Sequence, residues 1–267
     1  MRIARRTLVT GAAGRLGTVL RQAMAGADPR PRFTDRVGVP REPNVDFVRA
    51  ELAELPASGL LDGMDAVVHL AAESNEAPWP RLQSANVEAT HALYEAARRA
   101  RVGRIVLASS FHVVGFYERE QPVLAASPPR PDSLYAVSKV FGEALARYYW
   151  DKFGIESAVL RIGSCQPEPH TRTMLSTWLS HRDFVALVVR SLAADRVGFT
   201  TVYGVSANDA AGFTNDAAGH LGWVPQDNAA SFADRFADEP RPDPRDPVHR
   251  FRGGTFVARG SFDEEGA

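Results

Sequence analysis

The chain has 267 residues, 45% of them hydrophobic and 24% charged, and its formal net charge is -1. This length is enough to bury a sizeable core, and the near-neutral charge argues against a nucleic-acid or anionic-membrane partner. The apolar runs are too short to span a membrane. The single cysteine, Cys165, excludes an intrachain disulfide and favours a reducing compartment. We therefore expect a cytoplasmic protein with no nucleic-acid and no membrane partner.

Short apolar runs alternate with longer amphipathic segments along most of the chain. Strands are expected at 6–10, 31–35, 45–52, 64–72, 103–110, 155–162 and 199–206, and helices at 14–26, 81–100, 133–154, 176–195 and 228–238. The runs at 64–72 and 103–110 are continuously apolar, which is typical of strands covered on both faces. The alternation predicts an α/β, Rossmann-type fold, a doubly wound parallel sheet with helices on both faces.

The pattern loosens after the strand at 155–162, where we expect a small C-terminal substrate-binding part within one Rossmann-type domain, 1–267. The expected parts are a cofactor-binding core with the catalytic helix at 1–162, mainly substrate-side elements at 163–250, and a C-terminal tail at 251–267. The proline-rich stretch at 239–251 predicts an extended arm. The last residues, 260–267, are expected to fray.

The first expected strand ends in TGAAGRLG, which places glycines at positions 11, 14 and 17. Glycines here allow a tight turn and let backbone N–H groups approach a pyrophosphate at the following helix N-terminus. An acid, Asp35, stands about 20 residues further on, as the dinucleotide fingerprint requires. A carboxylate there binds the adenosine ribose and repels a 2′-phosphate, which favours NAD over NADP. The neighbouring Arg36 leaves binding of that phosphate open.

Tyr135 and Lys139 stand one helical turn apart in the segment YAVSK, so both side chains lie on one helix face. A nearby ammonium is expected to lower the pKa of the phenol from about 10 and make it usable as a general base. The strand at 103–110 ends in two serines, Ser109 and Ser110, at the edge where parallel sheets bind ligands. We expect Ser110 to hold a substrate hydroxyl for Tyr135, with Ser109 as the alternative.

Together, TGxxGxxG, a strand-end serine and YxxxK resemble the extended branch of the short-chain dehydrogenase/reductase superfamily. The segment NVEATHALYEAAR also resembles the helix that lines the cofactor cleft in that branch. A narrower resemblance to the uronate dehydrogenases covers nearly the whole chain, through RIGSC.PEP....MLSTW, GVSAND, LGW.P.DNA..F and RF.GGTF. That family oxidises C1 of cyclic galacturonate or glucuronate to the aldarolactone with NAD. The resemblance implies the same cofactor and a small-molecule sugar acid substrate here.

The resemblance also implies roles for individual residues. The catalytic residues would be Ser110, Tyr135 and Lys139. Cofactor contacts would come from Gly11, Ala13, Gly14, Arg15, Leu16, Gly17, Asp35, Arg36, Glu51, Leu52, Leu70, Ala71, Ala72, Asn86, Ala108, Tyr135, Lys139 and Ile162. Substrate contacts would come from Ser74, Ser110, Phe111, His112, Tyr135, Ser164, Arg172 and Thr173.

Two substrate positions depart from the family pattern. An asparagine usually follows the catalytic serine, but this chain has Phe111, which lacks both amide hydrogen-bonding groups. A polar partner left bare in a pocket costs about 1–3 kcal/mol. The family's carboxylate-binding arginine stands directly before ML, where this chain has Thr173 and places Arg172 one residue earlier. We expect Arg172 or a repositioned neighbour to bind the carboxylate. Near the adenine, Glu51 replaces a common aspartate.

Several conspicuous residues are expected to be structural. The histidines show no metal-ligand spacing, so we predict no metal site. His69, inside an apolar strand, is interpreted as a core residue, and Cys165 as a small buried residue rather than a nucleophile. The helices at 81–100 and 133–153 are expected to form a subunit contact in a homo-oligomer, with Trp150 and the pair at 148–149 in packing or interface roles.

Two other functions remain open. One is an extended-type epimerase or reductase that acts on another sugar or a nucleotide sugar, although little chain follows the sheet to bind a nucleotide. The other is a catalytically impaired NAD-binding protein. The intact set of Ser110, Tyr135 and Lys139 argues against that reading, whereas Phe111 and Thr173 leave it open.

Overall fold

The computed structural model describes residues 3–55, 58–240 and 243–259. Its main sheet has seven strands: β1 (Thr7–Thr10), β2 (Arg32–Asp35), β3 (Asp46–Arg49), β4 (Ala66–His69), β5 (Arg104–Ser110), β7 (Glu156–Ile162) and β10 (Phe199–Gly204). Their order is β10-β7-β5-β4-β1-β2-β3, and every neighbouring pair is parallel. The carboxyl ends of all seven strands therefore lie along one edge. The doubly wound parallel sheet predicted from the alternating pattern is confirmed.

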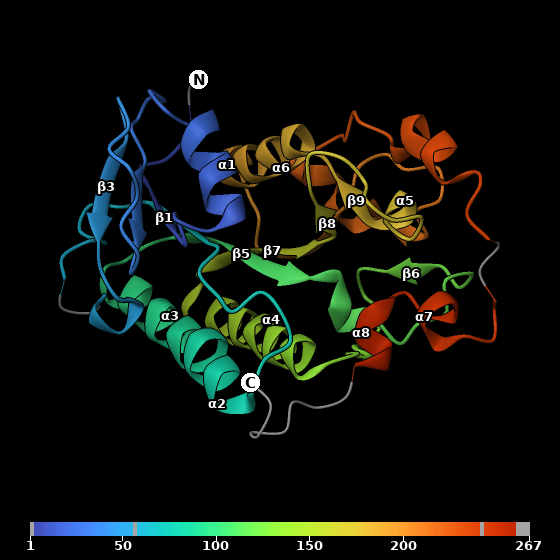
Figure 1. Cartoon of the computed structure of the whole chain (residues 1–267). Helices are drawn as coiled ribbons and strands as arrows, with labels where there is room; N and C mark the ends of the chain where they lie inside the picture. Colours follow the sequence, from blue (N-terminus) through green and yellow to red (C-terminus); the bar gives the residue numbers. More distant parts are fainter. Residues whose placement is uncertain (1–2, 56–57, 241–242, 260–267) are drawn as a thin grey trace.

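Helices cover both faces of the sheet. The helices α1 (Arg15–Ala23) and α6 (His181–Ala193) lie on one face, and α3 (Ala89–Arg99) and α4 (Leu134–Phe153) on the other (Figure 1). Val9 packs with Leu20 and Phe184 in the core of the first face. Its neighbour Leu8 belongs to the core of the second face. This alternation along β1 follows from the strand period of two, which sends successive side chains to opposite faces.

Two predicted helices differ from the structure at their starts. The helix expected at 81–100 begins earlier, as α2 (Trp79–Leu82), and passes through a π-helical segment (Gln83–Glu88) before α3. The helix expected at 176–195 is wrong in its first turn, which is divided between α5 (Met174–Thr177) and β9 (Trp178–Leu179). The Ser180 side chain accepts a hydrogen bond from the backbone N–H of Asp183, so it ends the preceding segment and caps α6.

The C-terminal part is more ordered than the predicted arm and tail. Within the stretch expected to be extended, α7 (Pro247–Arg250) forms a helical turn, because Asp246 caps it and Pro247 occupies its first position. Beyond it, the N–H groups of Arg252 and Gly253 donate to the carbonyls of Tyr117 and Gly115, and α8 (Thr255–Ala258) follows. The residues expected to fray, 260–267, lie outside the described part of the chain.

Short elements complete the chain. They are β6 (Val123–Leu124), β8 (Ser164–Cys165), β11 (Phe213–Thr214), and 3-10 turns at Leu52–Glu54, Phe111–Val114, Asp216–Leu221 and Ala229–Phe236. The last of these replaces the α-helix expected at 228–238. None of the helices in the described ranges is both long and apolar enough to cross a membrane.

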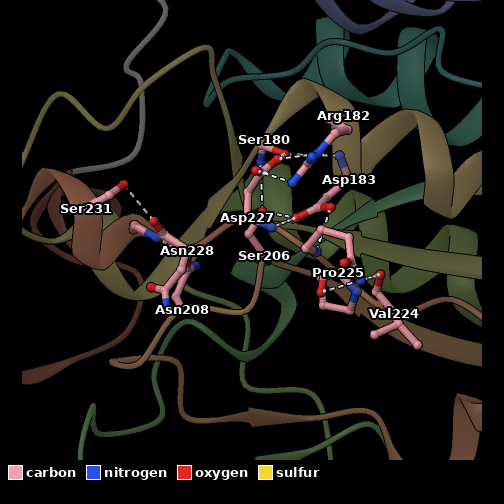
Figure 2. Close-up of polar contacts among 12 residues, drawn as sticks. Ser180, Arg182, Asp183, Ser206, Asn208, Val224, Pro225, Asp227, Asn228 and Ser231 are labelled. Carbon is pink, nitrogen blue, oxygen red and sulfur yellow. Dashed lines mark hydrogen bonds and ion pairs between the residues drawn. The ribbon is translucent and has the colours of Figure 1, made fainter.

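Motif residues of the C-terminal half make several polar contacts with one another (Figure 2). The Asp183 carboxylate accepts hydrogen bonds from the Ser206 hydroxyl at 2.7 Å and from the Asp227 N–H at 3.0 Å. The Asn208 amide donates to the Trp178 carbonyl at 2.8 Å. These bonds join the end of the loop at 163–178 to the segment after β10. The motifs that carried the family resemblance therefore support the loop that borders the strand ends.

Candidate active site

The turn between β1 and α1 is built for close approach of another backbone. Gly11 has a φ of 74°, and a Cβ there would lie 2.5 Å from the Ala71 nitrogen. A Cβ on Gly17 would lie 2.0 Å from the Gly11 carbonyl oxygen. The helix N-cap, Gly14, supplies no side-chain hydrogen bond, so the first N–H groups of α1 stay available to an anion. The turn therefore fits a pyrophosphate cradle.

A cleft of about 800 Å³ opens beside this turn. Ten of the residues predicted to contact the cofactor line it: Gly11, Ala13, Gly14, Asp35, Arg36, Glu51, Leu52, Leu70, Ala71 and Ala72. The Asp35 carboxylate accepts hydrogen bonds from the N–H groups of Ala13, at 2.9 Å, and Val37, at 3.0 Å. These bonds hold a negative charge at the cleft wall, where a ribose fits and a 2′-phosphate is repelled. The residues present therefore fit NAD.

The other predicted cofactor residues do not line this cleft: Arg15, Leu16, Gly17, Asn86, Ala108, Tyr135, Lys139 and Ile162. Asn86 is buried, and its amide contacts protein groups. Its oxygen accepts from the Glu73 N–H at 2.7 Å, and its nitrogen donates to the Glu73 carbonyl at 3.0 Å and to Ser138 at 2.8 Å. Asn86 thus links α4 to the loop that follows β4. We expected it to contact the cofactor, and in the structure its amide holds these two protein segments together.

Tyr135 lies in the first turn of α4, and two groups hold that helix end. The Ser133 hydroxyl accepts a hydrogen bond from the Ala136 N–H at 3.1 Å. The carboxylate of Glu76, in the loop after β4, accepts from the N–H groups of Leu134 at 3.0 Å and Tyr135 at 2.7 Å. Glu76 was not predicted from the sequence, because nothing around a single glutamate in a distant loop indicates that it contacts the start of α4.

The pKa of Tyr135 differs from the value expected from its spacing to Lys139. Burial raises the pKa of Tyr135 to about 12, opposed by the Ser110 hydroxyl. The expected lowering of this pKa by Lys139 is not found, because burial dominates. The Lys139 ammonium lies 5.6 Å from the centre of the Tyr135 ring and donates to the Ala108 carbonyl at 3.2 Å. Burial also lowers the pKa of Lys139 to about 8.

The two strand-end serines have different partners. The Ser109 hydroxyl donates to the Glu143 carboxylate at 2.6 Å, and Glu143 forms a buried ion pair with Arg161 at 2.8 Å. Ser110 accepts from the His112 N–H at 3.2 Å and interacts with the Tyr135 hydroxyl. The geometry therefore supports Ser110 as the serine of the site and gives Ser109 a structural role.

An aromatic cluster surrounds His112. The ring centres of Phe111 and Phe256 lie 4.2 Å and 4.0 Å from that of His112. The His112 ring centre is 6.2 Å from that of Tyr135, and its Nδ1 is 2.7 Å from the Asp132 carboxylate. Phe111 and His112 were predicted as substrate residues, whereas Asp132 and Phe256 were missed because distant segments bring them together.

The predicted carboxylate-binding loop is occupied by protein contacts. The Arg172 guanidinium binds the carbonyls of Phe236 and Glu239 and the carboxylate of Glu239. The Thr173 hydroxyl lies 2.9 Å from that of Thr171. Arg172 is therefore directed to the segment at 236–239, whereas we expected Arg172 or a repositioned neighbour to bind the substrate carboxylate.

The remaining predicted substrate residues lie near the strand ends. Ser164, in β8, has its hydroxyl 3.0 Å from that of Thr177. Ser74 is exposed in the loop after β4, and its N–H donates to the Glu73 carboxylate at 3.0 Å. Both residues thus stand just after strands of the main sheet, Ser164 after β7 and Ser74 after β4, at its carboxyl edge.

Arg15 is a cation at the same edge. Burial raises the pKa of Tyr135 and of Cys165 to about 12, and the positive charge of Arg15 opposes the rise in both. The Arg15 side chain is exposed, and within the described ranges no hydrogen bond or ion pair holds its guanidinium. Within the described residues, its guanidinium is therefore not engaged by a protein carboxylate.

Two residues expected to be structural are confirmed as such. His69 is 2% exposed, its Nδ1 lies 2.8 Å from the Thr10 hydroxyl, and burial lowers its pKa to about 3. Cys165 is buried and unpaired. Among the residues that the structure describes, no three histidine, cysteine, aspartate or glutamate side chains are grouped to hold a metal ion.

A dinucleotide cleft, a buried tyrosine with a lysine one turn on and a strand-end serine define a dehydrogenase of the short-chain type. A family model described as the NAD dependent epimerase/dehydratase family matches residues 7–194. The chain belongs to this family, and within it to the group of the uronate dehydrogenases.

The relatives agree over nearly the full length. Uronate dehydrogenase of Agrobacterium fabrum is 45% identical, over 97% of this chain and 99% of that protein. The crystal structure of uronate dehydrogenase from Agrobacterium tumefaciens, as a tyrosine-to-alanine mutant complexed with NAD, is 44% identical, with a TM-score of 0.92, and covers 99% of this chain and 100% of that chain. L-arabinose 1-dehydrogenase (NAD(P)(+)) of Haloferax volcanii is 34% identical, over 85% of this chain and 98% of that protein. The predicted resemblance is confirmed.

Proposed function

We propose that the protein is an NAD-dependent oxidoreductase that oxidises C1 of a hexuronate, galacturonate or glucuronate in the pyranose form, to the aldarolactone. One observation carries the proposal: Ser110 ends β5 and Tyr135 and Lys139 stand one turn apart on the neighbouring α4, in a chain 45% identical over 97% of its length to a uronate dehydrogenase. The intact trio with Lys139 argues against a protein that only binds NAD.

Ser110 holds the anomeric hydroxyl, and Tyr135 removes its proton. NAD, when bound, accepts the hydride from C1. The C1–H bond breaks with its electron pair, the hydroxyl proton passes to the Tyr135 oxygen, and a C1=O bond forms. Tyr135 must first be ionised. Burial raises the pKa of Tyr135 to about 12, and the Ser110 hydroxyl and the charge of Arg15 both favour the phenolate against that rise.

We further propose that Arg15 binds the substrate carboxylate. A uronate needs a cation that the protein has not already neutralised. Thr173 is uncharged, and Arg172 is bound to the segment at 236–239. Arg15 opens α1 at the carboxyl edge of the sheet, and its charge reaches Tyr135 and Cys165, the neighbour of Ser164. The competing role for Arg15 is the predicted contact with the cofactor, which NAD-binding measurements separate from a substrate role.

We propose a homo-oligomer that works in the cytoplasm. Helix α4 exposes large apolar side chains that are one and then two turns apart: Val137 is 41% exposed, Phe141 36% and Tyr148 46%. Such a stripe on one helix face is suited to cover by a second copy of the chain. The buried, unpaired Cys165 is compatible with a reducing compartment.

The test is a steady-state assay of NADH formation with galacturonate, glucuronate and their uncharged parent sugars, galactose and glucose. We expect turnover of a uronate with a kcat/KM at least tenfold above that of its parent sugar. Equal values for charged and uncharged sugars would refute carboxylate recognition. Turnover of none of them, together with binding of a UDP-sugar in calorimetry, would point to the nucleotide-sugar enzyme instead.

A further inference from the structure

Asp132 and His112 form a closely held pair next to Tyr135. The His112 Nδ1 lies 2.7 Å from Asp132 Oδ2, and the two side chains are 11% and 0% exposed. A carboxylate accepts hydrogen bonds and donates none, so the proton between these atoms belongs to Nδ1. In a neutral ring this leaves Nε2 as an acceptor. The bond from Asp132 to Nδ1 therefore determines whether Nε2 donates or accepts a hydrogen bond.

The Asp132 carboxylate has no room to turn away. Its Oδ1 accepts a hydrogen bond from the Ser133 hydroxyl at 2.8 Å. A Cβ on Gly115 or on Gly253 would lie 1.8 Å or 2.0 Å from Oδ2. Two backbone segments far apart in sequence thus close around the carboxylate, and only glycine at these positions leaves space for it.

Aromatic packing fixes the plane of the His112 ring. The ring packs against Phe256 with an interplanar angle of 27° and against Phe111 with an angle of 35°. Phe111 occupies the position where the family pattern has an asparagine. Its side chain offers no hydrogen bond, but it supplies an aromatic surface that restrains His112.

We propose that Asp132 is a positioning residue for the reaction: through its bond to Nδ1 it keeps Nε2 of His112 as the acceptor for a hydroxyl group of the bound sugar. Phe111 and Phe256 hold the ring in the orientation that Asp132 selects. The proposal rests on the proposed function, because it assumes that His112 faces the sugar that Tyr135 oxidises.

The first test is NMR of the imidazole nitrogens in the intact wild-type protein. We expect His112 as the Nδ1–H tautomer, with a strongly downfield Nδ1 proton that disappears in His112→Gln and in Asp132→Asn. An Nε2–H tautomer in the wild type would overturn the proposal. The tautomer of the wild-type protein is read without turnover, so this test separates failure of this inference from failure of the proposed function.

The second test is a double-mutant cycle in the uronate assay. We expect Asp132→Asn to lower kcat/KM by about tenfold or more, by analogy with carboxylates that orient functional histidines on metals. In the His112→Gln background the same substitution should have no further effect. An equal loss in both backgrounds would mean that Asp132 acts on the fold alone.

Ser133→Ala is the matched control for the cycle. It removes the cap of α4 and a hydrogen bond to Asp132 while leaving the contact between Asp132 and His112 in place. We expect a lower Tm but an unchanged His112 tautomer and an undiminished coupling between Asp132 and His112. Loss of that coupling in Ser133→Ala would show that the pair depends on the helix end rather than on the carboxylate, against the proposal.

Discussion

The hydroxyl of Ser109 donates a hydrogen bond of 2.6 Å to the carboxylate of Glu143, which is itself paired with Arg161. Ser109 is thereby part of a buried ion-pair network that joins β5, α4 and β7. Its neighbour Ser110, the last residue of β5, accepts instead from the His112 N–H and is left for the substrate. Two adjacent and chemically identical side chains therefore have different partners and different expected roles.

This difference predicts opposite phenotypes for the two serines. Ser110→Ala should lower kcat by on the order of 100-fold with little change in stability, because a group acting on the proton transfer is lost. Ser109→Ala should lower the free energy of unfolding by about 1–3 kcal/mol, because Glu143 loses a buried donor. Urea unfolding and steady-state kinetics on both variants distinguish them. The reverse pattern would assign the catalytic role to Ser109.

Substitutions of Arg15 and of Arg172 should affect binding of the substrate carboxylate differently. Arg15→Ala should raise the KM for uronate at least tenfold, the loss of a charge-assisted hydrogen bond, and leave the KM for the uncharged sugar unchanged. Arg172→Ala should change either KM less than twofold, since its guanidinium is bound to the segment at 236–239.

NAD titration by fluorescence is the control for Arg15. An unchanged Kd for NAD supports a role toward the substrate. A weaker Kd with an unaltered ratio of uronate to neutral-sugar kcat/KM would assign Arg15 to the cofactor instead.

The neutral, buried His69 makes stability depend on pH. Burial lowers its pKa from 6.5 to about 3, so below pH 6.5 the unfolded chain binds a proton that the folded chain does not. Stability is therefore fully present above pH 6.5 and is lost as pH falls toward 3, by at most about 1.4 kcal/mol per pH unit from this group. His69→Gln should flatten the dependence between pH 7 and 5 in urea unfolding. An unchanged slope would mean that other groups cause the acid destabilisation.

The exposed apolar stripe on α4 predicts the oligomeric contact. Phe141→Glu places a charge in the stripe and should shift the protein to a monomer in sedimentation velocity. Val224→Glu is the control, because Val224 is 69% exposed and lies outside α4, so it should leave the oligomer intact. A wild-type monomer, or an equal effect of both substitutions, would refute this contact.

Much of the site follows from local sequence, and the parts that do not are those set by distant contacts. The glycine turn, Asp35, Ser110 and Tyr135 stand at the ends of predicted strands or in the first turn of a predicted helix, and the strand–helix pattern places these ends at one edge of the sheet. Glu76 and Asp132 carry no such signal, because their partners lie 58 and 20 residues away in the chain. The pKa of Tyr135 depends on burial, which the one-turn spacing to Lys139 does not report. The contacts of Arg172 depend on the segment at 236–239, which lies 64 to 67 residues further along the chain and carries no signal of this contact.

The most direct test of the central claim follows the hydrogen atom on C1. With galacturonate or glucuronate deuterated at C1, we predict one deuterium transferred to the reduced cofactor per sugar consumed, and an aldarolactone product by NMR. Tyr135→Phe should remove both signals while the protein keeps its Tm and still binds NAD. An epimerised sugar that retains its deuterium, with no net reduced cofactor, would contradict the account.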